Sequence, residues 1–249
     1  MATGNDGSPP SNFDWIGFSD TNAMREAACR RILDAATCAI HERGRFVVVI
    51  AGGSTPREVY RTLRGADADW PRWHVYFGDE RCLPAGDPER NSTMAAEAWL
   101  DHVAIPPAQI HTIPTERGAE AAARAYTQTL RGTGDFDLVL LGLGEDGHTA
   151  SLFPGNDPGD AADAPDALAV FDAPKPPPER VSLSANRLSR TRAAMFLVTG
   201  EGKRSAVAQW HRGEDIPARS IQPRDGVDVL VESMLLPDDA SQGPQPAPE

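Results

Sequence analysis

The chain has 249 residues, enough for one sizeable hydrophobic core, and its 40% hydrophobic and 24% charged residues are typical of a globular protein. Its 36 acidic residues outnumber its 24 Lys and Arg, and the resulting net charge of −12 argues against binding to nucleic acid or to anionic membranes. An acidic chain can still bind an anionic metabolite where a few cations and backbone N–H groups gather.

The cysteines and the termini indicate the compartment. Three cysteines are an odd number without the spacing of a disulfide framework, which predicts free thiols in a reducing environment. No apolar run approaches the ~20 residues of a membrane span, and the polar N-terminus does not resemble a signal peptide. We therefore expect a cytoplasmic protein. We also expect a monomer or a small homo-oligomer. Residues 1–12 and 237–249 predict flexible tails around a single α/β domain over residues 13–236.

Periodicity predicts alternating helices and strands. Apolar residues at helical spacing predict a helix over Asn22–Glu42, and the β-branched run Phe46–Ala51 predicts a buried strand. Thr55-Pro56-Arg57-Glu58 then fits a capping box that opens a helix through Leu63. Further strands are predicted at Trp73–Phe77, Phe136–Leu141, Arg180–Ser184, Ala193–Thr199 and Val227–Glu232, and further helices at Thr93–His102, Ala119–Arg131 and Lys203–Trp210. This alternation predicts an open, mostly parallel, Rossmann-like sheet with helices on both faces.

One long segment has no such pattern. Residues 154–179 are rich in Pro, Asp, Ala and Gly and show little periodicity. A loop of this length inside a compact domain is usually functional or mobile. Because it follows His148 closely, we interpret it as a candidate lid.

The most informative stretch follows the predicted strand Phe136–Leu141 and has the sequence GLGEDGH over residues 142–148. Its glycines let the backbone turn sharply, and Asp146 and His148 lie where an open α/β sheet places its ligand crevice. A histidine can move protons near neutral pH, and a neighbouring aspartate can fix its tautomer. We interpret His148 as an acid–base residue assisted by Asp146.

Three alternatives compete at this stretch. The glycines at 142, 144 and 147 match a dinucleotide fingerprint, but Glu145 and Asp146 would face the pyrophosphate, and the acidic residue needed ~20 residues later falls in the proline-rich segment. Asp79 and Glu80 could complete a metal site, yet neither HExxH nor CxxC occurs and the spacing matches no zinc signature. A histidine satisfied by water is the third alternative. We expect no metal and no cofactor.

A second glycine turn, Gly52, Gly53, Ser54 and Thr55, joins a predicted strand to a predicted helix start. The free N–H groups and positive dipole of a helix start suit a phosphate, although a plain strand–helix connection explains the same residues.

Other charged residues also lie at the ends of predicted strands and helices. Asp79, Glu80 and Arg81 end another predicted strand, where either a solvated loop or catalytic side chains are expected. Arg180 and Lys203 are lone cations at a strand start and a helix start. Lys203 opposes the helix dipole unless an anion faces it, which hints at a ligand, although Glu201 could also supply the negative charge.

Four motifs, in this order, resemble those of the 6-phosphogluconolactonase family and, more loosely, the related glucosamine-6-phosphate deaminases and isomerases. They are AGGSTP at 51–56, GDER at 78–81 with the following Pro84 and Asn91, DGHTASLFP at 146–154, and VTG at 198–200 leading to Lys203. The resemblance spans roughly Phe46 to Val231. It implies hydrolysis of 6-phospho-D-glucono-1,5-lactone to 6-phosphogluconate in the oxidative pentose phosphate pathway, an α/β fold shared with those deaminases and isomerases, and no cofactor.

Residue by residue, the resemblance implies that Arg180 and Lys203 help the glycine turn at 52–55 to bind phosphate. It places Asp79 and Arg81 beside the lactone. It also implies that Asn91 binds substrate, although Arg90-Asn91-Ser92 departs from the usual serine-asparagine-aromatic run.

The same resemblance makes His148 the acid–base residue, with Asp146 nearby. Chemistry agrees, because an electrophilic lactone carbonyl needs an activated water, cations for the developing oxyanion and an anchor for the phosphate. We expect Arg81 to position the lactone or its oxyanion.

Two rival functions remain. The deaminases use a glutamate a few residues after the histidine to assist ring opening, but Phe153 stands at that position and cannot move a proton. A catalytically silent sugar-phosphate sensor predicts a damaged site, whereas Asp146, His148, Arg81 and Lys203 are all present.

Overall fold

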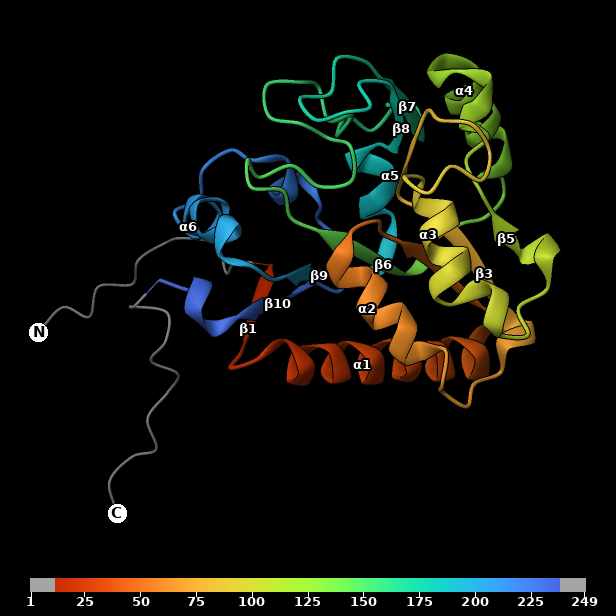
Figure 1. The fold of residues 1–249 in the computed structure, drawn as a ribbon, viewed down its shortest axis with the longest axis horizontal. Helices are drawn as coiled ribbons and strands as arrows, with labels where there is room; N and C mark the ends of the chain where they lie inside the picture. Colours follow the sequence, from red (N-terminus) through yellow and green to blue (C-terminus); the bar gives the residue numbers. More distant parts are fainter. Residues whose placement is uncertain (1–11, 238–249) are drawn as a thin grey trace, which may run out of the picture.

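The computed structural model describes residues 12–237, so the tails expected over 1–12 and 237–249 lie outside the described residues apart from Asn12 and Pro237. Seven strands form one sheet in the order β1-β10-β9-β6-β2-β3-β5, and every neighbouring pair is parallel (Figure 1). Three further strands form a smaller antiparallel sheet in the order β4-β8-β7. The boundaries predicted for a single domain stay a prediction.

The elements have the following bounds. The large sheet contains β1 (Phe13–Phe18), β2 (Phe46–Ile50), β3 (Trp73–Phe77), β5 (Ile110–His111), β6 (Phe136–Gly142), β9 (Thr191–Val198) and β10 (Val227–Glu232). The small sheet contains β4 (Asp79–Arg81), β7 (Ala167–Val170) and β8 (Arg180–Leu183). The helices are α1 (Thr21–Arg43), α2 (Ser54–Leu63), α3 (Asn91–Ala98), α4 (Ala119–Thr129), α5 (Ala185–Ser189) and α6 (Arg204–His211). Short 3₁₀ turns lie at Trp70–Arg72, Leu100–His102, Pro107–Gln109, Thr115–Arg117, Glu201–Lys203, Pro217–Ser220 and Ser233–Leu235.

Helices lie on both faces of the large sheet, as predicted. α1 packs on α2 and contacts β2, β6 and β10, whereas α5 contacts β9 and α4 packs against the small sheet. Figure 1 shows α1 along the bottom of the view and α4 and α5 above the sheet strands. The predicted parallel α/β architecture is confirmed. Among residues 12–237, no helix is long and apolar enough to cross a membrane.

The strand order places a ligand crevice. In the sheet, β3 and β5 lie on the far side of β2, and β9, β10 and β1 lie on the far side of β6. β2 and β6 are neighbours and are buried along almost their whole length. β2 is a run of apolar residues, and β6 is apolar apart from Asp137 near its start and Gly142 at its end. In open α/β sheets, ligands bind beyond the carboxyl ends of strands at such a switch of direction. The loops after β2 and β6 therefore face the same crevice.

The small sheet was not predicted. The strand predicted at Arg180–Ser184 exists as β8, but it pairs antiparallel with β4 and β7 and does not join the large sheet. β7 lies inside the segment 154–179, whose composition gave no strand signal. β1, β5 and α5 were also missed, because β1 is a partly exposed edge strand and the other two are short.

Two predicted helix starts were wrong in detail. α2 begins at Ser54 after Gly53, whose φ of +104° suits glycine, and no side chain caps it, so the predicted capping box at Thr55 does not form. The helix predicted at Thr93–His102 begins earlier, at Asn91, and ends at Ala98 before a separate 3₁₀ turn.

Candidate active site

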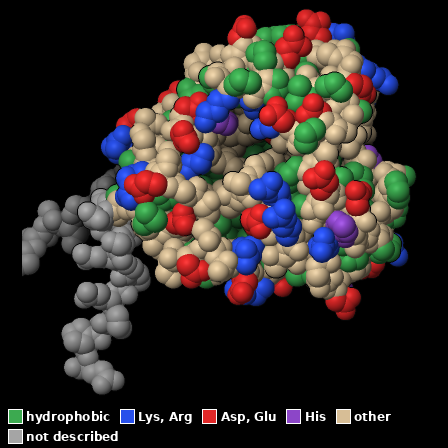
Figure 2. All heavy atoms as spheres, in the orientation of Figure 1, with side chains coloured by type: hydrophobic (Ala, Val, Ile, Leu, Met, Phe, Trp, Pro, Cys, Tyr) green, Lys and Arg blue, Asp and Glu red, His purple; other side chains and the backbone are tan. Residues whose placement is uncertain are grey.

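A cavity of about 460 Å³ opens where the loops after β2 and β6 meet the small sheet. Figure 2 shows this face of the molecule, with a central hollow bordered by Lys and Arg side chains. The structure brings together at the cavity every site residue predicted from the sequence except Asp146, which contacts His148 but is not part of the lining. The lining includes Gly52, Gly53, Ser54, Thr55, Asp79, Arg81, Asn91, His148, Arg180 and Lys203.

His148 and Asp146 form a close pair in the turn after β6. Asp146 Oδ1 lies 2.5 Å from His148 Nδ1 and also accepts the His148 backbone N–H at 3.2 Å. Burial acts to raise the pKa of the Asp146 carboxyl, but the hydrogen bonds and charge of His148 outweigh it and lower that pKa. An ionised Asp146 keeps the proton on Nδ1, which leaves Nε2 as a proton acceptor. The imidazole is 19% exposed and lines the cavity.

Gly144 makes room for this pair. A Cβ at position 144 would come within 2.0 Å of His148 Nδ1 and 2.6 Å of Asp146 Oδ1. The Gly144 N–H donates to the His148 carbonyl at 2.7 Å, which closes the turn. The glycine spacing that resembled a dinucleotide fingerprint therefore positions the histidine.

Asp79 is a buried carboxylate at the cavity wall, held from two sides. Its Oδ1 accepts from Asn91 Nδ2 at 2.9 Å, and its Oδ2 accepts from Ser151 Oγ at 2.6 Å. Asn91 lies so close to Gly52 that a Cβ there would meet Asn91 Oδ1 at 1.9 Å. Ser151 was missed as a site residue, although it belongs to the DGHTASLFP motif, because nothing local indicates a contact with Asp79.

Arg81 belongs to β4 and also lines the cavity. One terminal nitrogen donates to the Glu89 carbonyl at 2.7 Å. Its Nε is buried and has no hydrogen-bond partner among residues 12–237. Arg81 therefore keeps a donor that the described part of the fold does not use.

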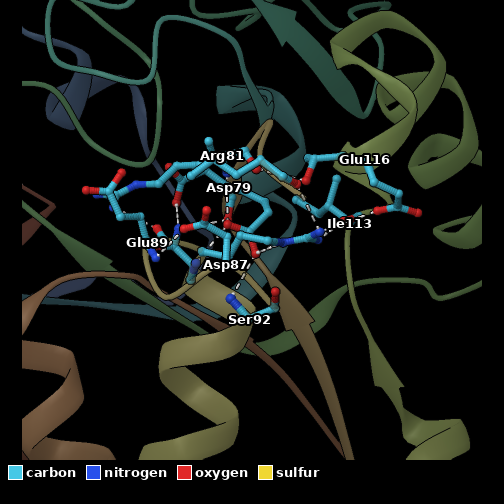
Figure 3. A network of polar contacts seen from close by, with 12 residues as sticks. Asp79, Arg81, Asp87, Glu89, Ser92, Ile113 and Glu116 are labelled. Atoms are coloured by element: carbon cyan, nitrogen blue, oxygen red, sulfur yellow. Dashed lines mark hydrogen bonds and ion pairs between the residues drawn. The ribbon is translucent and has the colours of Figure 1, made fainter. Parts of the chain in front are cut away.

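Glu80, next to Asp79, belongs to the scaffold. Its carboxylate accepts the backbone N–H groups of Arg81, Asn91 and Ser92 at 2.7–2.8 Å, and it pairs with Arg90 Nε at 3.5 Å. Figure 3 shows this network where β4 meets the start of α3. Glu80 thus satisfies the first N–H groups of α3, which explains why that helix begins before the predicted Thr93. Within the part of the chain that the structure describes, no three His, Cys, Asp or Glu side chains gather as metal ligands.

Arg180 is buried, with 6% of its surface exposed, and its guanidinium lies 5.6 Å from the Phe153 ring centroid. Its Nε donates to the Pro177 carbonyl, and one terminal nitrogen donates to the carbonyls of Lys175 and Pro176. Burial lowers the pKa of Arg180, with the Asp79 charge opposing that effect. The side chain that was predicted to bind phosphate therefore also fixes the segment 175–177.

That segment reaches the cavity, since Lys175 and Pro176 line it. The predicted lid thus contributes to the wall of the site, and its closure stays a prediction. Lys175 was not identified from the sequence, because its segment lacks periodicity.

The glycine turn at 52–55 is joined to the end of β9, the strand that leads to Lys203. Thr55 Oγ1 and Thr199 Oγ1 are 2.6 Å apart, which joins the start of α2 to the end of β9. Lys203 follows in the 3₁₀ turn Glu201–Lys203, and burial lowers the pKa of its ammonium. The first N–H groups of α2 have no partner within the helix and can bind an anion.

Comparison with known proteins agrees with this geometry. Residues 19–230 match the family described as glucosamine-6-phosphate isomerases/6-phosphogluconolactonase. The chain is 38% identical over 238 residues to the 6-phosphogluconolactonase of Mycobacterium leprae, which covers 90% of this chain and 95% of the relative. It is 36% identical over 205 residues to that of Rattus norvegicus, which covers 77% of this chain and 79% of the relative.

Solved structures show the same fold. A 6-phosphogluconolactonase from Shewanella baltica superposes with a TM-score of 0.76 at 26% identity, covering 89% of this chain and 97% of the other. A monomeric glucosamine-6-phosphate deaminase superposes with a TM-score of 0.77 at 20% identity, covering 89% and 98%, and shows the shared fold alone. The resemblance seen in the sequence motifs is confirmed, and the chain belongs to the glucosamine-6-phosphate isomerase and 6-phosphogluconolactonase family.

Proposed function

We propose that this chain is a hydrolase that converts 6-phospho-D-glucono-1,5-lactone to 6-phospho-D-gluconate, a step of the oxidative pentose phosphate pathway. The relatives at 35–39% identity are 6-phosphogluconolactonases. The observation that supports the proposal most is the His148–Asp146 pair, since the His148 imidazole lines the same cavity as the start of α2, to which we assign the phosphate.

Water is activated by His148. With Nδ1 held by Asp146, Nε2 takes a proton from a water molecule as its oxygen attacks the lactone carbonyl carbon. A new C–O bond forms, and the carbonyl electrons move onto the former carbonyl oxygen. We assign the Arg81 guanidinium, which lines the cavity, to this oxyanion.

Ring opening returns the proton. The oxyanion collapses to a carboxyl group, the bond between the carbonyl carbon and the ring oxygen breaks, and the His148 imidazolium protonates the leaving oxygen to a hydroxyl. The product acid then ionises in water. The histidine ends neutral and ready for the next turnover.

The phosphate orients the reacting carbon from a distance. Its oxygens suit the N–H groups at the start of α2 and the Lys203 ammonium, and the binding energy of this remote group holds the lactone against His148. Asp79, fixed by Asn91 and Ser151, is placed to accept from sugar hydroxyls.

One position argues against aminosugar-phosphate deamination. Where a deaminase needs a glutamate, Phe153 is buried, and its ring lies 4.8 Å from the His148 ring. An apolar ring gives the lactone a wall and offers no proton for opening an aminosugar.

The experiment is the rate of hydrolysis of freshly prepared 6-phosphogluconolactone by the purified chain, with an enzyme-free sample for the spontaneous reaction. We expect a rate far above that background, and no ammonia release from glucosamine 6-phosphate. Hydrolysis at the enzyme-free rate would contradict the proposal.

A further inference from the structure

Lysine is rare in this chain, and both lysines are at the cavity. Of the 24 Lys and Arg residues, only Lys175 and Lys203 are lysines. Both line the same cavity, although one comes from the proline-rich segment and the other from the turn after β9. A lysine ammonium is a compact point charge on a flexible stem, whereas an arginine guanidinium is planar and prefers fixed, paired contacts. The site thus has two ammonium groups on flexible stems.

Glu145 faces both of them. Its Oε2 lies 3.8 Å from Lys175 Nζ. Burial lowers the pKa of Lys203, and the charge of Glu145 is the largest effect opposing this. A Cβ at Gly202 would meet Glu145 Oε1 at 2.9 Å, so the carboxylate lies against the backbone of the turn that ends in Lys203. Glu145 is therefore a counter-ion for both lysines.

The two lysines differ in how firmly they are held. The backbone of Lys175 is fixed because its carbonyl accepts from Arg180 at 2.8 Å, but its side chain is 59% exposed. Lys203 is half-buried. The Lys175 ammonium can thus leave Glu145 and turn toward a ligand while its point of attachment stays in place.

A phosphate group competes directly with this carboxylate. It has nearly two negative charges at neutral pH, against one on Glu145, and three acceptor oxygens. It can therefore attract both ammonium groups more strongly than the carboxylate does. A nearby carboxylate also repels the phosphate.

We propose that Lys175 binds the phosphate of the substrate together with Lys203, and that the Glu145 carboxylate is the competing anion that this phosphate displaces. The inference rests on the proposed function and adds to it a loop-borne phosphate contact and a residue that tunes affinity. Arg180 acts here as a positioning residue for Lys175.

Kinetics of Lys175 variants test the contact. Lys175→Met should raise KM for the phosphorylated lactone by about 10-fold, with kcat and the turnover of unphosphorylated glucono-1,5-lactone nearly unchanged. Lys175→Arg keeps the charge and should restore most of the affinity. An unchanged KM in Lys175→Met would overturn the assignment.

Glu145→Gln tests the competition. Removing the carboxylate should lower KM by about 2–5-fold, because exposed charges interact modestly. The matched control is Glu120→Gln on α4, an exposed carboxylate paired with Arg124 and outside the cavity lining. This control removes one negative charge from a chain of net charge −12 without touching the cavity lining. It should leave KM unchanged. A higher KM in Glu145→Gln, or an equal fall in the control, would contradict the proposal.

A binding experiment separates this inference from the proposed function. Reductive methylation with ¹³C labels the two lysines, and NMR follows both signals as inorganic phosphate is added to the whole chain. The N-terminal amine is labelled as well, so Lys175→Met and Lys203→Arg identify which signals belong to the two lysines. We expect both lysine signals to shift with one shared Kd, and that Kd to fall in Glu145→Gln. Movement of the Lys203 signal alone would contradict the inference even if the lactone is hydrolysed, while shared movement without hydrolysis would contradict only the proposed function.

Discussion

The two sheets supply different kinds of side chain to one cavity. The large parallel sheet contributes loops, in which His148 and Asp146 are two residues apart and the anion site is made by the start of α2. The small antiparallel sheet contributes two buried charges. Asp79 accepts a hydrogen bond from Ser151, 72 residues away, and Arg180 donates to the nearby Lys175 carbonyl in the proline-rich segment.

This difference separates chemistry from positioning. A histidine on a partly exposed turn can change its protonation and meet water, which acid–base work requires. A buried carboxylate held by Asn91 and Ser151 cannot move, which suits a group that orients hydroxyls. We therefore expect substitutions of His148 and Asp146 to change turnover, and substitutions of Asp79 and Arg180 to change stability or affinity.

The largest effect on stability should come from Glu80→Ala. It removes the acceptor of three backbone N–H groups and leaves Arg90 buried beside an empty partner position, which costs about 3–5 kcal/mol. Urea unfolding measures the change. Glu116→Ala removes the other, exposed partner of Arg90 and should cost less than about 1 kcal/mol. Equal losses would show that the small sheet does not depend on Glu80.

The next largest effect should come from Gly144→Ala, which tests the turn after β6. The added Cβ would overlap His148 Nδ1 and Asp146 Oδ1, and misplacing a catalytic group by about 1 Å can cost ~10²-fold in kcat. Steady-state kinetics measure the loss. Gly65→Ala, where a Cβ makes only an ordinary contact at 3.7 Å, serves as control and should retain full turnover. Normal turnover in Gly144→Ala would contradict the positioning role.

A smaller effect, on the affinity for 6-phosphogluconate, should follow the loss of the Lys203 proton at high pH. Burial lowers the pKa of its ammonium, so as the pH rises the cation is lost at a lower pH than the cation of an exposed lysine. Calorimetry of 6-phosphogluconate binding between about pH 7 and pH 10 should show affinity falling ~10-fold. Lys203→Arg should move the fall to higher pH. A fall at the same pH in both proteins would exclude Lys203 as its cause.

Metal removal should have the smallest effect. Because the described residues form no ligand set and the proposed chemistry uses His148 and Arg81, dialysis against a strong chelator should leave the hydrolysis rate unchanged. Loss of activity that one divalent ion restores would contradict this expectation.

The parts of the molecule that depend on local sequence could be predicted. The central strands β2 and β6 are apolar apart from Asp137 and the terminal Gly142 of β6, and the turns around Gly53 and His148 are formed by residues that are adjacent in the sequence. The parallel α/β fold and the family followed from these patterns. The capping box failed because the hydroxyl of Thr55 meets Thr199 in place of the helix backbone.

The parts that depend on long-range pairing could not be predicted. Asp79 meets Ser151 across 72 residues, and no local pattern distinguishes it from Glu80, whose carboxylate turns to α3. β7 is four residues within a proline-rich segment, and its strand exists only because β8 lies beside it. The contribution of Lys175 to the cavity depends on the same segment.

The central claim is that the His148–Asp146 pair performs the proton transfers, and kcat of His148→Ala tests it most directly. A general base contributes typically ~10²–10⁴-fold, so kcat should fall by about that factor while the protein stays folded and still binds 6-phosphogluconate. Asp146→Asn should cost less, because it misorients the imidazole and leaves it in place. A folded His148→Ala protein that retains most of its kcat would contradict the mechanism.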